Sequence, residues 1–192
     1  MYHEGNRQLQ DTFGSRGLAD RLEAKIRRDR FNEDDARFIA SLSFFFLATA
    51  DPEGRPDCSF KGGPPGFARV IDPDLLVFPD YDGNGMFKSL GNVRANPHVG
   101  LLFISMEDSP RRLRVNGDAE ILLDDPLIET IPGAQLVVKV RPTAIFGNCP
   151  RYIPRMKLLE PSPYLPEAGA PSLEPKWKSF EIFADVVPPR RR

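Results

Sequence analysis

Residues 83–97, with the sequence GNGMFKSLGNVRANP, place a glycine turn directly before a predicted short helix. Backbone N–H groups in the first turn of a helix have no intrahelical partner, and the helix dipole favours an anion beside them. Lys88, Ser89 and Asn92 supply further hydrogen-bond donors close by. The segment therefore predicts a phosphate-binding site, with a small phosphorylated cofactor as the expected ligand. Glycine turns also open helices in proteins that bind no ligand, so the flanking segments matter.

Apolar segments lie on both sides of this helix. Residues 75–78 (LLVF) precede the turn, and residues 99–104 (VGLLFI) follow Asn96 and Pro97. Short apolar runs bounded by turn residues are typical of buried strands. This order favours a ligand site over an isolated turn: a strand, a Gly-Asn turn, a short helix, an Asn-Pro pair and a second strand.

The start of the chain predicts two helices that flank the rest of the protein. Leu18, Leu22 and Ile26 recur every four residues within residues 15–30, which is the spacing of an amphipathic helix. Asn32 is a suitable N-cap for a second helix with an acidic first turn. The residues of this second helix that are expected to face the core are Phe38, Ile39 and Leu42.

The middle of the chain predicts many short strands. They are expected at residues 43–49, 57–61, 67–71, 75–78, 99–104, 111–115, 119–123 and 136–145. Short turns rich in Gly, Pro, Asn and Asp separate most of them, which favours an antiparallel barrel or sandwich.

The end of the chain has a different composition. Residues 158–175 contain five prolines and predict coil. Residues 176–183 regain an apolar pattern and are expected to dock on the protein itself or on a partner, whereas residues 188–192 are expected to be disordered.

Composition limits the possible functions. The chain has 192 residues, 26 Lys plus Arg and 27 Asp plus Glu, and a net charge of −1. This balance argues against a nucleic-acid or anionic-membrane partner and favours a small-molecule ligand. No apolar run of 18 residues and no signal-peptide pattern is present, so a cytoplasmic location is expected.

The chain offers few residues for other kinds of chemistry. The only two cysteines, Cys58 and Cys149, predict reduced thiols, and the only two histidines, His3 and His98, predict no metal site. No nucleophile, base and acid stand in a recognisable order, so no catalytic residue is assigned.

Four segments together resemble the FMN-binding split barrels of the pyridoxamine 5'-phosphate oxidase-like family, in the branch with a Gly-Asn turn. They are residues 2–10, 59–67, 83–97 and 113–120. The resemblance covers residues 1–155 and implies a mainly β fold, an antiparallel six-stranded split β-barrel with flanking helices. Residues 156–192 then form a Pro-rich C-terminal extension that packs on the barrel or on a dimer partner.

The same resemblance implies the cofactor-binding residues. They are Ser59, Lys61, Asn84, Met86, Lys88, Ser89 and Asn92. The branch usually has an Arg where this chain has Met86, so the positive charge lies two residues later, at Lys88. Asn84 is also a good turn residue in a left-handed conformation. Asn92 either reaches the phosphate or serves as a structural amide.

The resemblance implies an FMN-dependent oxidoreductase that acts on an unidentified small molecule, as a homodimer with flavin at the subunit interface. Two alternatives stay open: a flavin-binding protein for storage or sensing without turnover, and a deazaflavin-dependent reductase on the same barrel. Haem is disfavoured because no histidine is suited to axial ligation. Oxidation of vitamin B6 itself is not supported, because a Pro-rich stretch replaces the basic C-terminal segment of true pyridoxamine phosphate oxidases.

Overall fold

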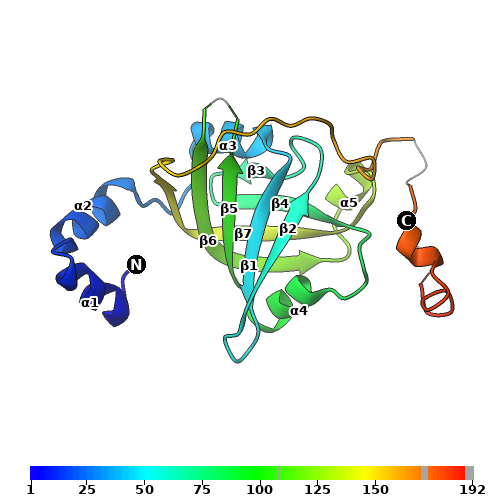
Figure 1. Cartoon of the computed structure of the whole chain (residues 1–192), viewed down its shortest axis with the longest axis horizontal. Coiled ribbons are helices and arrows are strands. Elements are labelled where there is room, and N and C mark those ends of the chain that lie inside the picture. Colours follow the sequence, from blue (N-terminus) through cyan, green and yellow to red (C-terminus); the bar gives the residue numbers. More distant parts are fainter. Residues whose placement is uncertain (108, 170–172, 189–192) are drawn as a thin grey trace.

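The computed structural model describes residues 1–107, 109–169 and 173–188. Its centre is a seven-stranded antiparallel sheet that curls around an apolar core, with strand order β2-β1-β5-β6-β7-β4-β3 (Figure 1). The strands are β1 (Phe44–Ala50), β2 (Pro56–Gly62), β3 (Arg69–Asp72), β4 (Leu75–Tyr81), β5 (His98–Ser105), β6 (Arg111–Leu122) and β7 (Ala134–Asn148). The mainly β, antiparallel prediction is confirmed.

The prediction of six strands is wrong, because the sheet has seven. The two strands expected at residues 111–115 and 119–123 are one strand, β6, with a register shift between Asn116 and Gly117 where it pairs with β7. A Cβ atom at Gly117 would lie 2.3 Å from the carbonyl oxygen of Arg141. The Asn-Gly-Asp sequence therefore forms a β-bulge with close backbone contact rather than a turn. Closure of the sheet into a split barrel stays a prediction.

The core lies inside the curl of the sheet. Side chains alternate along β1, so that Phe45 and Leu47 point inward. The ring of Phe45 lies 5.0 Å from those of Phe78 and Phe103. Helices α3 (Glu33–Ser41) and α4 (Lys88–Ala95) also pack against this core, and both contribute buried side chains to it.

Helix α3 follows the sequence prediction closely. Asn32 caps it in a capping box with Asp35, and the predicted core residues are all buried: Phe38, Ile39 and Leu42. Asp35 is only 1% exposed and also accepts hydrogen bonds from both terminal nitrogens of Arg28. This ion pair ties the segment before α3 to the helix.

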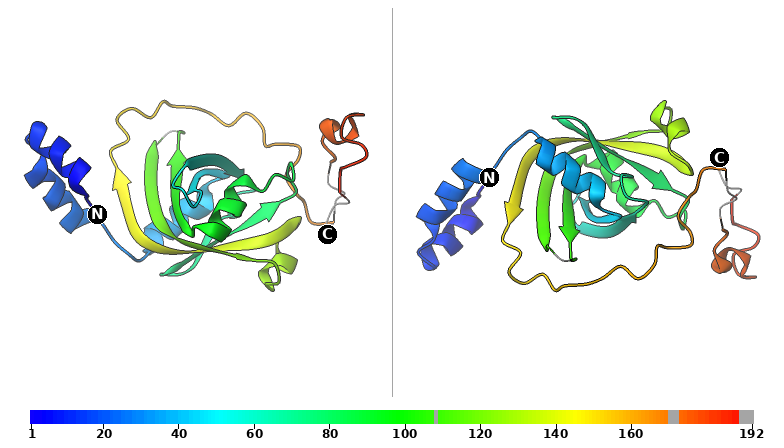
Figure 2. Two further views of the ribbon diagram at one scale, coloured as in Figure 1. Left: turned by 90° about the horizontal axis from the view of Figure 1, so that it is seen from below. Right: turned by 90° about the horizontal axis from the view of Figure 1, so that it is seen from above.

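The N-terminal helices lie away from the sheet (Figures 1 and 2). The predicted helix over residues 15–30 is the shorter α2 (Arg16–Ile26), which pairs with α1 (Glu4–Thr12) in a hairpin. Neither helix contributes a buried residue, so the prediction that the helix carrying Leu18, Leu22 and Ile26 flanks the rest of the protein is wrong. The apolar stripe is instead exposed to solvent.

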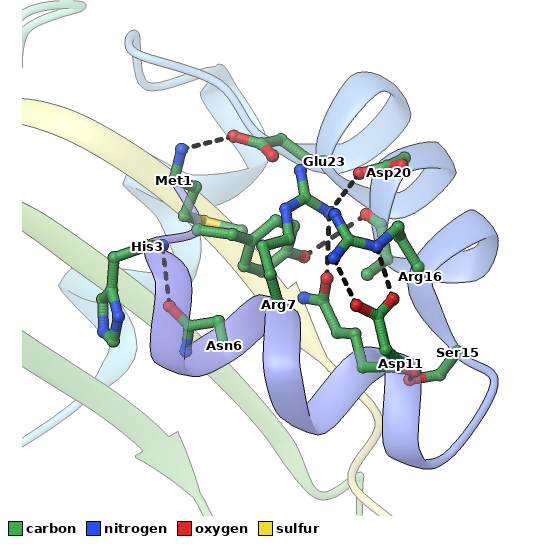
Figure 3. Close-up of polar contacts among 12 residues, drawn as sticks. Met1, His3, Asn6, Arg7, Asp11, Ser15, Arg16, Asp20 and Glu23 are labelled. Atoms are coloured by element: carbon green, nitrogen blue, oxygen red, sulfur yellow. Dashed lines mark hydrogen bonds and ion pairs between the residues drawn. The ribbon is translucent and has the colours of Figure 1, made fainter.

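Polar contacts join the two helices of this hairpin (Figure 3). The amino terminus of Met1 lies 2.7 Å from a carboxylate oxygen of Glu23, and Arg7 lies 2.6 Å from Asp20. Within α1, the Asn6 side chain accepts a hydrogen bond from the His3 backbone at 3.0 Å. Surface ion pairs of this kind are individually weak, so they orient the hairpin without giving it a core.

The Pro-rich extension leads to the opposite end of the molecule from the hairpin (Figure 2). The short helix α5 (Leu127–Thr130) lies between β6 and β7, and the helical element that follows the sheet is the 3-10 helix η1 (Lys176–Ser179). The described residues between β7 and η1 form no helix or strand, as predicted for this coil. Residues 189–192 of the predicted disordered tail lie outside the described residues. No helix in the described part of the chain is long and apolar enough to span a membrane.

Candidate functional site

The predicted glycine turn borders a cavity of about 240 Å³ between β2, the end of β4 and the start of α4. Six of the seven predicted cofactor-binding residues line it: Ser59, Lys61, Asn84, Met86, Lys88 and Ser89. They come from a strand and a turn that are more than twenty residues apart in the chain. The sheet therefore brings together the two segments that the sequence singled out.

Strand β2 supplies three polar side chains to the cavity. Alternation along the strand turns Asp57, Ser59 and Lys61 inward while Cys58 and Phe60 point outward. The Ser59 hydroxyl oxygen is buried and has no hydrogen-bond partner among the described residues. A buried hydroxyl without a partner is costly, so it marks a place where a ligand oxygen is expected.

Asn84 acts as a turn residue without the left-handed conformation that it tolerates. Positive φ angles occur at Gly85 (73°) and Phe87 (47°), not at Asn84. Asn84 instead accepts a hydrogen bond from the Met86 backbone at 3.0 Å, which makes an Asx turn. Phe87 is the single non-glycine residue with positive φ in the described ranges, a strained conformation of the type that clusters at functional sites.

Helix α4 begins beside the cavity without a capping side chain. Phe87 is its N-cap residue and makes no side-chain cap hydrogen bond. The N–H groups of the first turn therefore stay available to an anion. Lys88 is exposed and has no ion-pair partner within the part of the chain that the structure describes. Ser89 is buried, and its hydroxyl donates to a carboxylate oxygen of Asp57 at 2.7 Å.

Asn92 does not line the cavity. It is buried, and its side-chain amide donates to the Thr49 hydroxyl oxygen at 3.1 Å. This contact joins α4 to β1. Of the two roles that the sequence left open for Asn92, it corresponds to the structural amide that holds the helix in place.

Seven lining residues were not among the predicted cofactor-binding residues: Asp57, Asp80, Tyr81, Gly83, Gly85, Phe87 and Leu90. Asp57 was detectable, because it precedes Ser59 by two residues and must share its strand face. Asp80 lies 3.5 Å from the Lys61 amine, yet burial raises the pKa of its carboxyl group above the usual value, against the opposing effect of Lys61. Burial also raises the pKa of Tyr81 to about 12. No sequence signal pointed to these two, because only the curl of the sheet brings β4 against β2.

The donors at this cavity fit a phosphate group. The unpartnered Ser59 hydroxyl, the Lys88 amine and the uncapped start of α4 all offer hydrogens. The two carboxylates of the cavity are both engaged, Asp57 by Ser89 and Asp80 by Lys61. No group of three or more metal-ligating side chains occurs among the described residues.

An antiparallel sheet with a polar cavity beside a short helix defines a mainly β protein suited to a small ligand. The family model described as Pyridoxamine 5'-phosphate oxidase matches residues 31–149, which is more than half of the chain. The chain belongs to the pyridoxamine 5'-phosphate oxidase family, as the sequence motifs suggested. A comparison with curated protein sequences found no match.

Solved structures of similar fold include a HupZ variant from Group A Streptococcus, with 16% identity, coverage of 62% of this chain and 100% of that chain, and a TM-score of 0.50. An FMN-binding protein from Syntrophomonas wolfei has 12% identity, coverage of 73% and 97%, and a TM-score of 0.45. The heme storage protein HutZ from Vibrio cholerae has 17% identity, coverage of 61% and 94%, and a TM-score of 0.43. At 16% identity, the similarity to HupZ concerns the fold alone.

Proposed function

We propose that this protein binds FMN at the 240 Å³ cavity and acts as an FMN-dependent oxidoreductase on a small organic molecule. The observation that carries the proposal is the buried, unpartnered Ser59 hydroxyl beside the uncapped start of α4, in a member of this family. Both groups donate hydrogen bonds, and a phosphate accepts several at once.

Each lining residue has a specific task in this proposal. Ser59, Lys88 and the first N–H groups of α4 hold the phosphate, and Lys61 balances the carboxylate of Asp80 at the same wall. The Asx turn of Asn84 sets the path of the chain into the helix. Tyr81 stays protonated at neutral pH, because its pKa is about 12, and it offers a hydroxyl hydrogen at the cavity wall. Bound FMN supplies the hydride-transfer chemistry, which these side chains do not provide.

A second copy of the chain is part of the proposal. A cavity of about 240 Å³ is smaller than the roughly 300–1,000 Å³ of typical small-molecule sites, so one chain encloses only part of the cofactor. Met86 and Phe87 at its rim are 72% and 50% exposed. A homodimer with the flavin between subunits covers these side chains and completes the site.

The outer face of the sheet offers a surface for this second copy. The pairing register places Phe60, Phe46, Leu102, Arg114 and Phe146 side by side across β2, β1, β5, β6 and β7. Phe60 is 62% exposed, and its ring packs with those of Phe44 and Phe46. Phe60 is the exposed aromatic side chain of this row, with Phe46 and Phe146 half-buried in it, and surface aromatic side chains are enriched in protein interfaces. Sedimentation velocity is expected to give a dimer, and Phe60→Glu is expected to give monomer with reduced FMN retention.

The direct test is an absorbance spectrum of freshly purified protein, with mass spectrometry of the released chromophore and titration of the stripped protein with FMN. A flavin spectrum and a mass equal to FMN are expected. Lys88→Ala should raise the dissociation constant for FMN about five-fold at low salt and less at high salt, because Lys88 is exposed and its charge is screened. The matched control is Lys157→Ala, which removes an exposed lysine outside the cavity.

The other outcomes separate the alternatives. FMN uptake with no reduction by nicotinamide donors and no turnover of any screened substrate would assign a binding role without catalysis. Uptake of a deazaflavin in place of FMN would assign a deazaflavin-dependent reductase. No uptake of either, or FMN uptake that Lys88→Ala weakens no more than Lys157→Ala, would refute the proposed site.

A further inference from the structure

A second and larger cavity, of about 460 Å³, lies on the other side of the glycine turn. Residues from α4, from the ends of β6 and β7 and from the C-terminal segment line it. Its apolar lining includes Leu90, Ile121, Leu123, Leu136, Trp177 and Val187. The volume falls within the range of small-molecule sites, and the walls are mostly hydrocarbon and aromatic.

The C-terminal segment is what makes this a cavity. The Lys178 amine forms a hydrogen-bonded ion pair with Asp82, just after β4, and this contact raises the pKa of Lys178. The pair holds η1 against the turn, and the ring of Phe183 packs edge-on against Trp177 at 5.9 Å. Trp177 thereby closes one side of a space that the sheet and α4 would leave open.

The polar groups of this cavity leave one lining cation available to an anion. Asp82 and Glu174 both pair with Lys178, whereas Arg94 on α4 has no ion-pair partner within residues 1–107, 109–169 and 173–188. Trp177 adds an indole N–H, and Gln135 an amide that can donate or accept, neither with a hydrogen-bond partner in the same ranges. Arg94 is therefore the charged lining residue that a ligand anion can pair with.

We propose that this cavity binds a small organic anion with an apolar body, such as a carboxylate on a hydrocarbon chain or ring. The body lies against Leu123, Leu136 and Trp177, and the anionic group pairs with Arg94. Residues 83–85, Phe87 and Leu90 line both cavities, so this ligand and the proposed cofactor share a wall. The assignment of this ligand as the substrate of the flavin rests on the proposed function. The binding of the ligand to this cavity does not depend on that function.

Octanoate and its neutral counterpart octanamide are suitable probes, since neither absorbs where tryptophan does. Trp177 is the only tryptophan of the chain, so its fluorescence reports on this cavity alone. In flavin-free protein, octanoate is expected to bind saturably, to change this fluorescence and to bind more tightly than octanamide. Calorimetry gives the affinities independently of the fluorescence.

Arg94→Gln should weaken octanoate binding about five-fold or more and leave octanamide binding unchanged, because only the anion uses the guanidinium. Arg151→Gln, which removes an exposed arginine outside the cavity, is the matched control and should change neither. Leu123→Glu is a second variant at an exposed position and should also weaken octanoate by adding a negative charge to the wall. Absence of saturable octanoate binding, or an affinity that neither variant alters, would overturn the proposal.

Failure of this inference differs from failure of the proposed function. FMN binding without octanoate binding refutes the second site alone. Octanoate binding without FMN binding leaves an apolar-anion site and removes the flavin function. In FMN-loaded protein, octanoate is expected to shift the flavin absorbance, since the two cavities share the glycine turn; an unchanged spectrum at saturating octanoate would refute the substrate assignment.

Discussion

Replacing Ser59 by alanine should change the stability and the affinity of this protein in opposite directions. The Ser59 hydroxyl oxygen is buried and has no partner among the described residues. A buried polar group without a hydrogen bond costs about 1–3 kcal/mol. Ser59→Ala removes that group and leaves the strand intact, so the flavin-free protein should gain about 1 kcal/mol of stability. For a chain of this size, that corresponds to a rise in melting temperature of about 2–4 °C.

The affinity for FMN should fall in the same variant. If Ser59 donates to the phosphate, its loss removes a hydrogen bond to a charged group worth about 1.5–3 kcal/mol. Because this position is buried, solvent does not screen the contact, and the dissociation constant should rise about 10- to 150-fold. Thermal unfolding of the stripped protein and fluorescence titration with FMN measure the two effects separately.

Thr49→Val is the matched control, because Thr49 carries a buried hydroxyl whose oxygen is already used. It accepts a hydrogen bond from Asn92, 3.1 Å away, so the change leaves a buried amide unpaired and should destabilise the protein by about 1–3 kcal/mol. A Ser59→Ala variant that also loses stability, or that binds FMN as tightly as the natural protein, would refute the reasoning about Ser59.

Three further predictions concern stability. Asp35→Ala should lower the free energy of unfolding by about 3 kcal/mol, measured by denaturant titration, because it removes the carboxylate partner of Arg28 and the Asp35 half of the capping box of α3. Burial raises the pKa of Tyr81 from 10.0 to about 12, so the stabilising contribution of Tyr81 is complete below pH 10 and is lost as the pH rises toward 12. In a spectrophotometric titration, Tyr81→Phe should lack the tyrosine ionisation that occurs at the highest pH. An unchanged titration would count against burial of Tyr81. Gly117→Ala should be strongly destabilising in thermal unfolding because its Cβ meets backbone, whereas Gly17→Ala in α2, where nothing lies within 4 Å, should increase helicity by circular dichroism; equal effects would refute the bulge contact.

Local signals explain which elements the sequence predicted well. The capping residue Asn32 and the spacing of Phe38, Ile39 and Leu42 determine α3 within one short segment, and the β1–β2 hairpin follows from two apolar runs around a turn. Six predicted cavity residues cluster because they lie on two such local elements. In each case the information is confined to a few neighbouring residues.

The errors arise where the outcome depends on distant partners. The Asn-Gly-Asp sequence at residues 116–118 looks like a turn, but pairing with β5 and β7 on both sides keeps it in one strand. The apolar stripe of α2 predicts burial, but α2 pairs with α1 through polar contacts and lies away from the sheet. Asp80 and Tyr81 enter the site only because the curl of the sheet brings the end of β4 near Lys61 of β2.

The sequence by itself determined the secondary structure around the glycine turn, the family and the polar residues of β2 and α4, because each depends on residue type and short-range spacing. Only the tertiary structure decided that Ser59 is buried without a partner, that Asp57 and Asp80 are both engaged, and that Trp177 closes a second cavity beside the first. Burial, pKa and cavity shape depend on which distant segments come together. That arrangement follows from packing of the whole chain around one core, which no local segment specifies.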